Sequence, residues 1–432
     1  MKYNKERFPD TGDKMRKDKL TAIDIFAGGG GLSEGFYRAG FNIINHIEKD
    51  KHAVETLRTR IIFYLLKEKG LLKEYYKYLF GQIARKDLVT RYNLENFIGS
   101  NVICEEITDR TIKDIIQRIK LSMKTRDIKN VDVLLGGPPC QAYSIVGRAR
   151  DPYKMEYDKR NYLYKYYIEF LEEFNPEIFV FENVPGLISA GKGKLFEDIK
   201  RYMNNIGYEI NYRILNSADF MVLQNRKRVI LIGWKKENNF KYPFFERMEN
   251  SYRVKDVLDD IPDLKAGEGS ENAQDYKISR INDYLRKTKI RTHYDKVINH
   301  VARSHRKADL EIYSYAINKY LKGERIKYTD LPEELQFHKN RKNFLDRFKV
   351  VDRNASASHT VVSHIAKDGH YYIHPDINQL RSLTVREVAR LQSFPDSYKF
   401  EGPRTAQFIQ VGNAIPPLMA EEIALKIKEI LK

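Results

Sequence analysis

The sequence contains very little cysteine, with two cysteines among 432 residues. This scarcity excludes a fold held together by disulfides and is typical of a reducing compartment, so we expect a cytoplasmic protein. No apolar run approaches the roughly 18 residues that a membrane span needs. The first 20 residues are charged and lack an apolar core, which predicts a mobile N-terminal tail rather than a signal peptide.

Negative charge is also scarce relative to positive charge. The chain has 76 Lys and Arg against 59 Asp and Glu, a net charge of +17, and its pI is near 9.4. Such a balance, with 12% aromatic residues, indicates a polyanionic partner, most simply nucleic acid. A basic protein without such a partner is the alternative that charge alone leaves open. The length is sufficient for two domains and a large core.

A glycine-rich turn follows the first apolar segment. Residues 21–26 (TAIDIF) predict a buried strand, the run AGGGG turns the chain, and residues 33–39 predict a helix. A second strand is predicted over residues 41–47, and Glu48 stands at its end, 20 positions after Gly28. An acidic residue at this spacing is where a nucleoside-binding α/β unit bonds ribose hydroxyls. The motif is not a strict GxGxxG, so an ordinary tight turn is the alternative.

One cysteine lies on a stiff loop. Residues 131–135 (VDVLL) predict a strand, and GGPPCQ places Cys140 directly after two glycines and two prolines. α/β folds position reactive groups at such carboxyl ends of strands. A lone cysteine is otherwise a small buried hydrophobe, so this segment alone leaves nucleophile and core residue equally open. The other cysteine, Cys104, falls inside a predicted strand at 102–106 and is interpreted as structural.

Two further segments carry polar residues with a chemical use. Residues 177–181 predict a strand, and Glu182 follows at its end before a Pro-Gly turn. In QNRKR, an extended backbone would place Gln224, Arg226 and Arg228 on one face and aim two guanidiniums into the same site. The alternative for this basic run is a solvated hairpin.

The remaining chain is less regular. Residues 51–96 predict one or two amphipathic helices. Between 235 and 378 the alternation of strands and helices disappears, which predicts a second, smaller domain with strands at 358–365 and 371–373. A helix is predicted over 381–394, starting at Thr384, and a last helix from Pro417.

Taken together, these segments resemble one family. In order, they are DIFAGGGGLSEGF, the acidic Glu48, GGPPCQAYS, FENV, QNRKR, RSLTVREVARLQSFPDSY and QVGNAIPPLMAEEIA, and they span residues 24–424. Their order and spacing are similar to those of the DNA (cytosine-5) methyltransferase family of the bacterial restriction–modification type. The resemblance implies an α/β fold: a class I S-adenosylmethionine-dependent methyltransferase domain, with a mostly parallel doubly wound sheet, and a smaller target-recognition domain.

The resemblance also implies a chemistry. The Cys140 thiolate would add to C6 of cytosine, so that C5 can attack an electrophilic methyl group. Glu182 would bond the base at N3 and the exocyclic amine, and Arg228 would hold O2. Arg226 would contact a neighbouring phosphate or form the pocket wall. The predicted catalytic residues are therefore Cys140, Glu182, Arg226 and Arg228, with no metal.

The implied methyl donor is S-adenosyl-L-methionine. Its predicted binding residues are Phe26, Gly28, Gly30, Leu32, Glu48, Glu106, Ile107, Pro138 and Asn413. Within this set, Glu48 would bind the ribose, Ile107 would pack on the adenine ring, and Asn413 would close the pocket from the C-terminal side. In the family, an Asp usually reads the adenine amine, and Glu106 occupies its position in this sequence.

The implied substrate is double-stranded DNA with the target cytosine flipped out of the stack. Residues 141–160 would form a lid, and Gln141, Ser144, Arg148 and Gln224 would contact the DNA. The expected division is a tail (1–20), a catalytic and cofactor-binding domain (21–234), a target-recognition domain (235–378) and a segment that returns to the catalytic domain (379–432). We expect a monomer whose functional partner is a cognate restriction endonuclease.

Two other functions remain open at this stage. One is an RNA (tRNA) cytosine-5 methyltransferase, against which the long 235–378 segment argues. The other is a non-catalytic DNA-binding regulator, which would not require Cys140, Glu182, Arg226 and Arg228 together. An amino-methyltransferase is disfavoured because methylating an exocyclic nitrogen needs no thiol.

Overall fold

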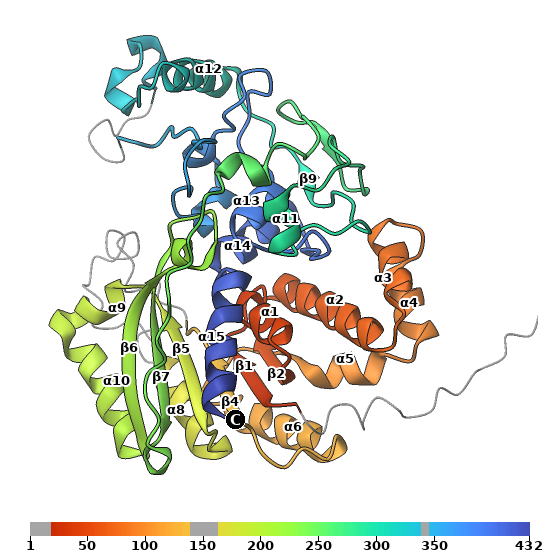
Figure 1. Ribbon diagram of the computed structural model, residues 1–432, viewed down its shortest axis with the longest axis vertical. Coiled ribbons are helices and arrows are strands. Elements are labelled where there is room, and N and C mark those ends of the chain that lie inside the picture. The colour runs from red at the N-terminus through yellow and green to blue at the C-terminus, as the bar shows by residue number, and fades with distance from the viewer. Residues whose placement is uncertain (1–18, 139–162, 338–344) are drawn as a thin grey trace, which may run out of the picture.

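The chain forms two lobes in a computed structural model that describes residues 19–138, 163–337 and 345–432. The lower lobe in Figure 1 contains the large sheet, and the upper lobe contains α11, α12 and α13. No helix among the described residues is long and apolar enough to cross a membrane.

A seven-stranded sheet organises the lower lobe, in the order β3-β2-β1-β4-β5-β7-β6. The first five strands of this order pair in parallel, whereas β7 runs antiparallel to both β5 and β6. The predicted α/β class with a mostly parallel sheet is therefore confirmed. The strands are β1 (Thr21–Ile25), β2 (Asn42–Glu48), β3 (Val102–Cys104), β4 (Val133–Gly136), β5 (Ile178–Asn183), β6 (Tyr208–Asn216) and β7 (Lys227–Lys235).

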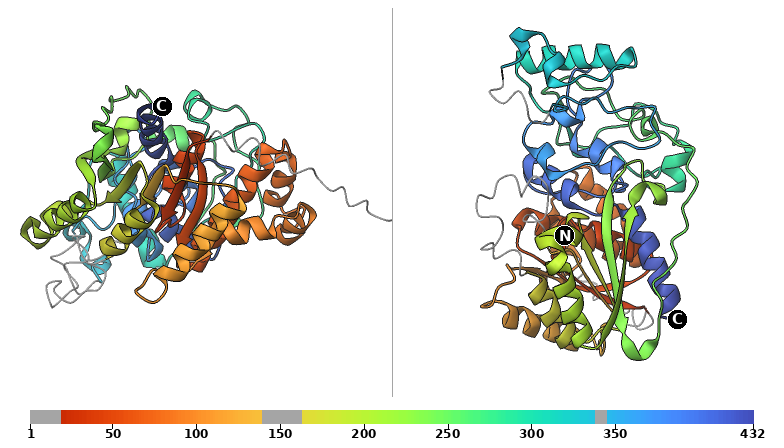
Figure 2. Two further views of the ribbon diagram at one scale, coloured as in Figure 1. Left: turned by 90° about the horizontal axis from the view of Figure 1, so that it is seen from below. Right: turned by 90° about the vertical axis from the view of Figure 1, so that its left-hand side faces the viewer.

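Helices cover both faces of the sheet (Figure 2), so the central strands are mainly apolar on both faces rather than alternating. One face packs against α6 (Ile112–Thr125), α8 (Leu163–Phe174) and α10 (Lys194–Asn205). The other packs against α1 (Gly31–Arg38) and the last helix, α15 (Pro417–Ile430). The short α9 (Gly186–Ser189) follows β5. The strands that end at the site are thus held rigidly from both sides.

The 51–96 segment holds more helices than expected. Four are present: α2 (Lys51–Glu68), α3 (Leu72–Leu79), α4 (Arg85–Arg91) and α5 (Glu95–Asn101). Two tyrosines of α3 reach the other lobe. The Tyr75 hydroxyl donates to the Ser397 carbonyl at 2.9 Å, and that of Tyr76 donates to Asp295 Oδ1 at 2.9 Å. This insertion therefore braces the two lobes against each other.

The smaller lobe is built from short elements joined by side-chain contacts. The prediction of strands at 358–365 and 371–373 is wrong. The chain there forms 3-10 turns at Ser363–Ala366 and His370–Tyr372. Side chains replace ladder partners: the Val361 N–H donates to Gln224 Oε1 at 2.8 Å, and the Val362 N–H donates to the Tyr372 hydroxyl at 3.0 Å. The regular elements are β8 (Gly269–Ser270), β9 (His300–Val301), α11 (Asp283–Lys287), α12 (Lys307–Leu321), α13 (Val385–Leu391) and α14 (Arg404–Asn413).

The helix predicted to start at Thr384 is confirmed as α13. The Thr384 hydroxyl accepts from the Glu387 N–H, and the Glu387 carboxylate accepts from the Thr384 N–H, which is a capping box. This helix is buried on all sides. Arg390 is fully buried and pairs with Asp396 at 2.6 Å and with Asp260, so its charge is compensated inside the core.

The C-terminal segment divides between the two lobes. Apolar residues of α13 and α14 share one core with residues 254–372 of the smaller lobe. Only α15 packs in the core against β1, β2 and α1. We expected residues 379–432 to return to the catalytic domain. α15 packs on the sheet, whereas α13 and α14 share the core of the smaller lobe.

Candidate active site and cofactor site

Three strand ends meet at one edge of the sheet. Ile25, the last residue of β1, lies opposite Gly136 of β4, and Gly136 lies opposite Phe181 of β5. The glycine-rich turn, the Gly-Gly-Pro turn and Glu182 therefore come together, as the strand-end positions in the sequence predicted.

Glu182 is paired with Arg228. Its Oε1 lies 2.7 Å from Arg228 Nε, and the two side chains are 15% and 12% exposed. A Cβ atom at Gly137 would lie 2.5 Å from Glu182 Oε2, so only glycine leaves this carboxylate in place. A charged pair that is neither fully buried nor freely solvated can bind a polar planar group at the sheet edge.

The loop that leads to Cys140 is anchored at its start. Asn183 Nδ2 donates to the Pro138 carbonyl at 3.2 Å, and Pro138 is buried. Cys140 follows two positions later in the sequence. Cys140, Gln141, Ser144, Arg148 and the predicted lid at 141–160 lie outside the described residues, so these assignments stay predictions.

Arg226 does not point into the same site as Arg228. It is fully buried, and its two terminal nitrogens donate to the Val361 carbonyl at 2.6 Å and to the Gly412 carbonyl at 3.0 Å. The strand β7 begins only at Lys227, so the alternation that we expected does not extend back to residue 226. The position excludes direct contact with a phosphate in this structure, and Arg226 instead joins the segment before β7 to the smaller lobe.

Gln224 is not placed to contact DNA. Its side chain is fully buried: the amide nitrogen donates to Gln392 Oε1 at 3.0 Å, and the oxygen accepts from the Val361 N–H at 2.8 Å. The amide thus connects the end of α13 with the segment at Val361. The prediction of a DNA contact for Gln224 is wrong, because sequence spacing gave its face but not its burial.

The glycine-rich turn offers open space at one glycine and close packing at the next. Gly28 has φ +55°, and a Cβ atom there would meet nothing within 4 Å. At Gly30, with φ +78°, a Cβ atom would lie 2.6 Å from the Tyr398 hydroxyl and 2.8 Å from Leu57. Gly28 therefore faces the region where a ligand can approach the backbone, whereas Gly30 makes room for protein.

The C-terminal segment supports this turn from behind. The Tyr398 hydroxyl donates to the Gly29 carbonyl at 2.7 Å. A Cβ atom at Gly31 would collide with the Ile415 carbonyl, and one at Gly35 would collide with Ala420 of α15. Sequence reasoning missed Tyr398, although its place in the PDSY run next to the α13 motif was a usable signal.

Glu48 closes the turn from the side of β2. Its Oε2 accepts from the Gly28 N–H at 2.8 Å, and its Oε1 accepts from the N–H groups of Lys49 (2.9 Å) and Asp50 (2.8 Å). Burial raises the pKa of Glu48, and these backbone donors act in the opposite direction. A carboxylate offers about four acceptor positions, so capacity remains for a ligand hydroxyl.

The other predicted cofactor residues differ in exposure. Phe26 adopts φ +57° where β1 enters the turn. Leu32 is 8% exposed and Ile107 is 4% exposed, so both lie mainly in the core. The Glu106 side chain is 59% exposed and lies 2.8 Å from Lys49 Nζ, so its carboxylate is accessible but already paired.

Two further residues of interest are exposed. Asn413, the last residue of α14, is exposed, as a residue that closes a pocket requires. Cys104 is the last residue of β3 and is exposed, whereas we expected it inside a strand over residues 102–106. The strand stops before the side chain at 104 can be covered.

Asp24 is a buried carboxyl group that sequence reasoning did not single out. It is 1% exposed and accepts a hydrogen bond from the Ser33 hydroxyl. Burial raises the pKa of Asp24 to about 7. A charged residue inside the apolar run TAIDIF was the signal. The hydrogen bond between Ser33 and Asp24 joins α1 to β1 across the turn.

No group of His, Cys, Asp and Glu side chains that could hold a metal ion occurs in residues 19–138, 163–337 and 345–432. The polar groups at the sheet edge instead form hydrogen bonds with each other and with the backbone. They can bind a base and a nucleoside.

Comparisons with known proteins give matches over nearly the whole length of this chain. A family profile described as C-5 cytosine-specific DNA methylase matches residues 20–66 and 67–429. The chain is 43% identical to the type II methyltransferase M.Bpa9945I of Bacillus paralicheniformis, over 95% of this chain and 99% of that protein. It is 32% identical to the type II methyltransferase M.DdeI of Desulfomicrobium norvegicum, over 94% and 88%.

A solved structure has the same fold. It is described as a putative DNA modification methyltransferase encoded within a prophage of E. coli, and it superposes with a TM-score of 0.62 over 96% of this chain and 99% of that one. The two sequences are 23% identical, so this likeness concerns the fold alone.

Proposed function

Because the chain belongs to the family of C-5 cytosine-specific DNA methylases, we propose a role for each group at the sheet edge in methylating cytosine. The chain is a DNA (cytosine-5-)-methyltransferase of the type II, restriction–modification kind, which confirms the family and the activity predicted from its motifs. The observation that carries the assignment of roles is the Glu182–Arg228 pair, which stands beside the turn that leads to Cys140.

Cys140 is the nucleophile in this proposal. Cytosine C5 is a poor nucleophile, and a thiolate that adds at C6 makes C5 electron-rich enough to take a methyl group. The C5 proton then leaves, the C6–sulfur bond breaks, and the thiolate is regenerated. Pro138, held by Asn183, fixes the start of the loop and thereby limits where the thiol can lie.

Glu182 and Arg228 hold the base. The Glu182 carboxylate accepts from the exocyclic amine and shares a proton with N3 as charge builds on the ring. Arg228 donates to O2 and neutralises the glutamate in the absence of the base. Arg226 acts through the fold, because it links the segment that carries Arg228 to the Gly412 carbonyl.

Family membership implies S-adenosylmethionine, which supplies an electrophilic methyl group when bound. The residues around the turn fit such a ligand. Gly28 leaves open space beside the backbone, and Glu48 keeps acceptor capacity for a ribose hydroxyl. Glu106 is accessible to an adenine amine once Lys49 gives way, and the exposed Asn413 lies at the C-terminal side of the pocket. Phe26, Gly30, Leu32, Ile107 and Pro138 shape the walls.

DNA is the substrate, and the target cytosine has to leave the duplex to reach a pocket at the sheet edge. Residues 235–378 read the sequence, and residues 141–160, with Gln141, Ser144 and Arg148, close over the flipped base. The cognate partner is a restriction endonuclease that cuts the same DNA sequence when its cytosine is not methylated. The enzyme acts as a monomer in the cytoplasm, on the nucleoid.

A trapping experiment tests this assignment of roles. DNA in which the target cytosine carries fluorine at C5 cannot release the C5 substituent, so the thioether to Cys140 persists. Wild-type enzyme with donor should give a DNA adduct that survives denaturing electrophoresis, and Cys140→Ser should give none while it still retains DNA in a native gel. An adduct of equal yield with Cys140→Ser would refute the nucleophile. The same assay with RNA separates the tRNA alternative, and a chain without activity on either would be a regulator.

A further inference from the structure

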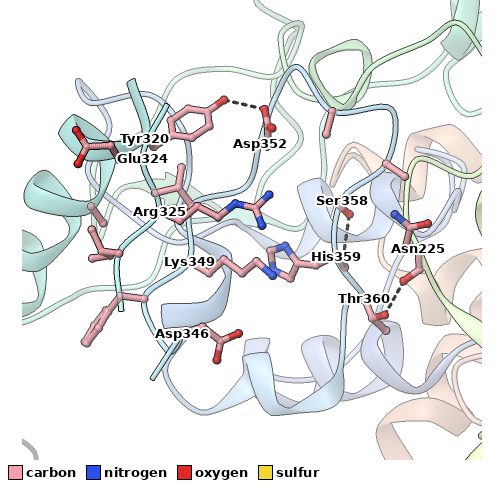
Figure 3. A pocket seen from close by; sticks show the side chains of 16 residues that line it. Asn225, Tyr320, Glu324, Arg325, Asp346, Lys349, Asp352, Ser358, His359 and Thr360 are labelled. Atoms are coloured by element: carbon pink, nitrogen blue, oxygen red, sulfur yellow. Dashed lines mark hydrogen bonds between the residues drawn. The ribbon is translucent and has the colours of Figure 1, made fainter. Parts of the chain in front are cut away.

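A cavity of about 470 Å³ lies in the smaller lobe, away from the Glu182–Arg228 pair. Figure 3 shows it between the end of α12 and the segment 346–360, with Asn225 of the sheet lobe at its rim. Its volume falls within the roughly 300–1,000 Å³ that is usual for small-molecule pockets. Nothing in the methyl-transfer chemistry above uses it.

Basic side chains from two segments converge in this cavity. Arg325, which follows α12, and Lys349 point toward His359 (Figure 3). Neither Arg325 nor Lys349 forms an ion pair within the described part of the chain. Burial lowers the pKa of Lys349, Asp346 opposes this effect, and the Arg325 charge adds to it. Donors are thus available for an acceptor-rich ligand.

The cavity also presents acceptors that are held in place. Asp346 accepts from the Tyr371 hydroxyl at 2.5 Å, and Asp352 accepts from the Tyr320 hydroxyl at 3.0 Å. His359 Nε2 lies 2.5 Å from the Tyr371 carbonyl, and burial lowers the pKa of His359 to about 4, so the neutral ring keeps Nδ1 as an acceptor. The carboxylates each have an oxygen left for a ligand.

Apolar side chains complete the walls. They are Ala316, Ile326, Phe348, Val350, Ala355 and Ala357. A ligand that suits the cavity has apolar surfaces, one edge that accepts hydrogen bonds and another that donates them. Nucleobases have this combination, and a bare phosphate does not, because it has neither apolar faces nor donors to match the carboxylates.

We propose that this cavity binds a guanine of the recognition sequence after the guanine has left its base pair. Arg325 and Lys349 take its O6 and N7 acceptors, the contact by which proteins most often read guanine. Asp346 takes its N1 and N2 donors with its two carboxylate oxygens, whereas Asp352 lies on the other side of Arg325 and Lys349 (Figure 3). In the duplex, N1–H is engaged by the paired cytosine, so a carboxylate reaches it only when the base is unpaired. The proposal rests on DNA being the substrate.

The cavity is joined to the base-holding strand. The Thr360 hydroxyl donates to the Asn225 carbonyl at 2.5 Å, and the Asn225 N–H donates to the Ser358 carbonyl at 2.8 Å. Asn225 lies three positions before Arg228, the partner of Glu182. A base bound in the cavity would therefore stabilise the segment that presents Arg228, so that recognition precedes chemistry.

The first test is a change of specificity. Wild-type enzyme, Arg325→Ala, Lys349→Ala and the control Lys322→Ala methylate a plasmid library with randomised flanks, and bisulfite sequencing gives the preference at each position. Lys322 is exposed at the end of α12 and does not line the cavity. Both cavity variants should relax the guanine preference at one position other than the target by roughly 10- to 100-fold. Lys322→Ala should keep the wild-type motif.

The second test asks whether that guanine leaves the helix. Its partner cytosine is replaced by an abasic site, which removes the cost of unpairing. Wild-type enzyme should bind this duplex at least about 10-fold more tightly, and the double variant Arg325→Ala/Lys349→Ala should lose the gain. Equal weakening at all positions would mean phosphate contacts, and an unchanged preference or no gain from the abasic site would also overturn the proposal. A wild-type enzyme that methylates nothing would instead refute the activity itself.

Discussion

The Tyr398 hydroxyl donates a hydrogen bond of 2.7 Å to the Gly29 carbonyl, across 369 positions of the chain. The ring of Tyr398 belongs to the core of the smaller lobe, whereas Gly29 belongs to the turn proposed to hold the methyl donor. Because Gly30 lacks a side chain, the hydroxyl can approach the turn closely. The smaller lobe, which is proposed to read the DNA, thus positions the turn that is proposed to hold the donor.

Removing this hydroxyl should weaken donor binding. Tyr398→Phe loses one buried hydrogen bond, worth about 1 kcal/mol, and leaves the Gly29 carbonyl without its donor. We expect a several-fold rise in KM for S-adenosylmethionine with little change in KM for DNA. Tyr284→Phe is the matched control, since its hydroxyl is also buried and donates to the Met221 carbonyl at 2.9 Å. Equal effects of the two variants on the donor KM would show that only general stability had changed.

Gly137 should control the position of Glu182. An added methyl group at Gly137 would lie 2.5 Å from Glu182 Oε2, and a flexible carboxylate can move away from it. Gly137→Ala should therefore fold with nearly unchanged Tm and lose about 10²-fold or more in kcat, as expected when a proton-sharing group is misplaced. In Gly136→Ala the methyl group would meet the Ile25 carbonyl at 2.7 Å, so that variant should lose stability instead. Full activity of Gly137→Ala would contradict the role of Glu182.

Glu48 should matter more for the donor than for DNA. Its carboxylate holds the Gly28 N–H and keeps capacity for a ribose hydroxyl. Glu48→Ala should weaken S-adenosylmethionine binding by at least about 10-fold in calorimetry, while DNA binding in a gel-shift assay changes little. A donor affinity equal to that of the wild type would remove Glu48 from the site.

Asp24 should make stability depend on pH. Its pKa is raised from 3.8 to about 7, so the fold favours the protonated form. The stabilisation is fully present below about pH 4 and is lost as pH rises through 7, by at most ~4 kcal/mol. Asp24→Asn keeps a neutral acceptor for Ser33 and should be less sensitive to pH. Denaturant unfolding at pH 5 and pH 8 measures the free energy of unfolding. Asp24→Asn should be more stable relative to wild type at pH 8 than at pH 5. An equal difference between the two proteins at both pH values would contradict the role of Asp24.

The strand ends that carry the site could be predicted from the sequence. TAIDIF, VDVLL and EIFVF are mainly apolar because both faces of a parallel strand are buried. The residues that follow these strands are polar or glycine, which burial does not explain. That contrast located Glu48, Glu182 and the turn before Cys140. The pairing of Glu182 with Arg228 was not predicted, and it arises because the sheet brings β5 beside β7.

Burial of polar side chains could not be predicted. Gln224 and Arg226 look like surface residues in QNRKR, yet both are covered by segments more than 100 positions away. Their partners are mainly backbone carbonyls and amides of the smaller lobe, which no spacing rule reveals. The same long-range contacts replaced the expected strand at 358–365 with turns.

Bisulfite sequencing of plasmid DNA from cells that express the chain, beside a Cys140→Ala control, tests the central claim most directly. Cytosines in one short motif should be protected from conversion in the wild-type sample and converted in the control. Conversion of all cytosines with well-expressed, soluble wild-type enzyme, or equal protection in the Cys140→Ala sample, would contradict it.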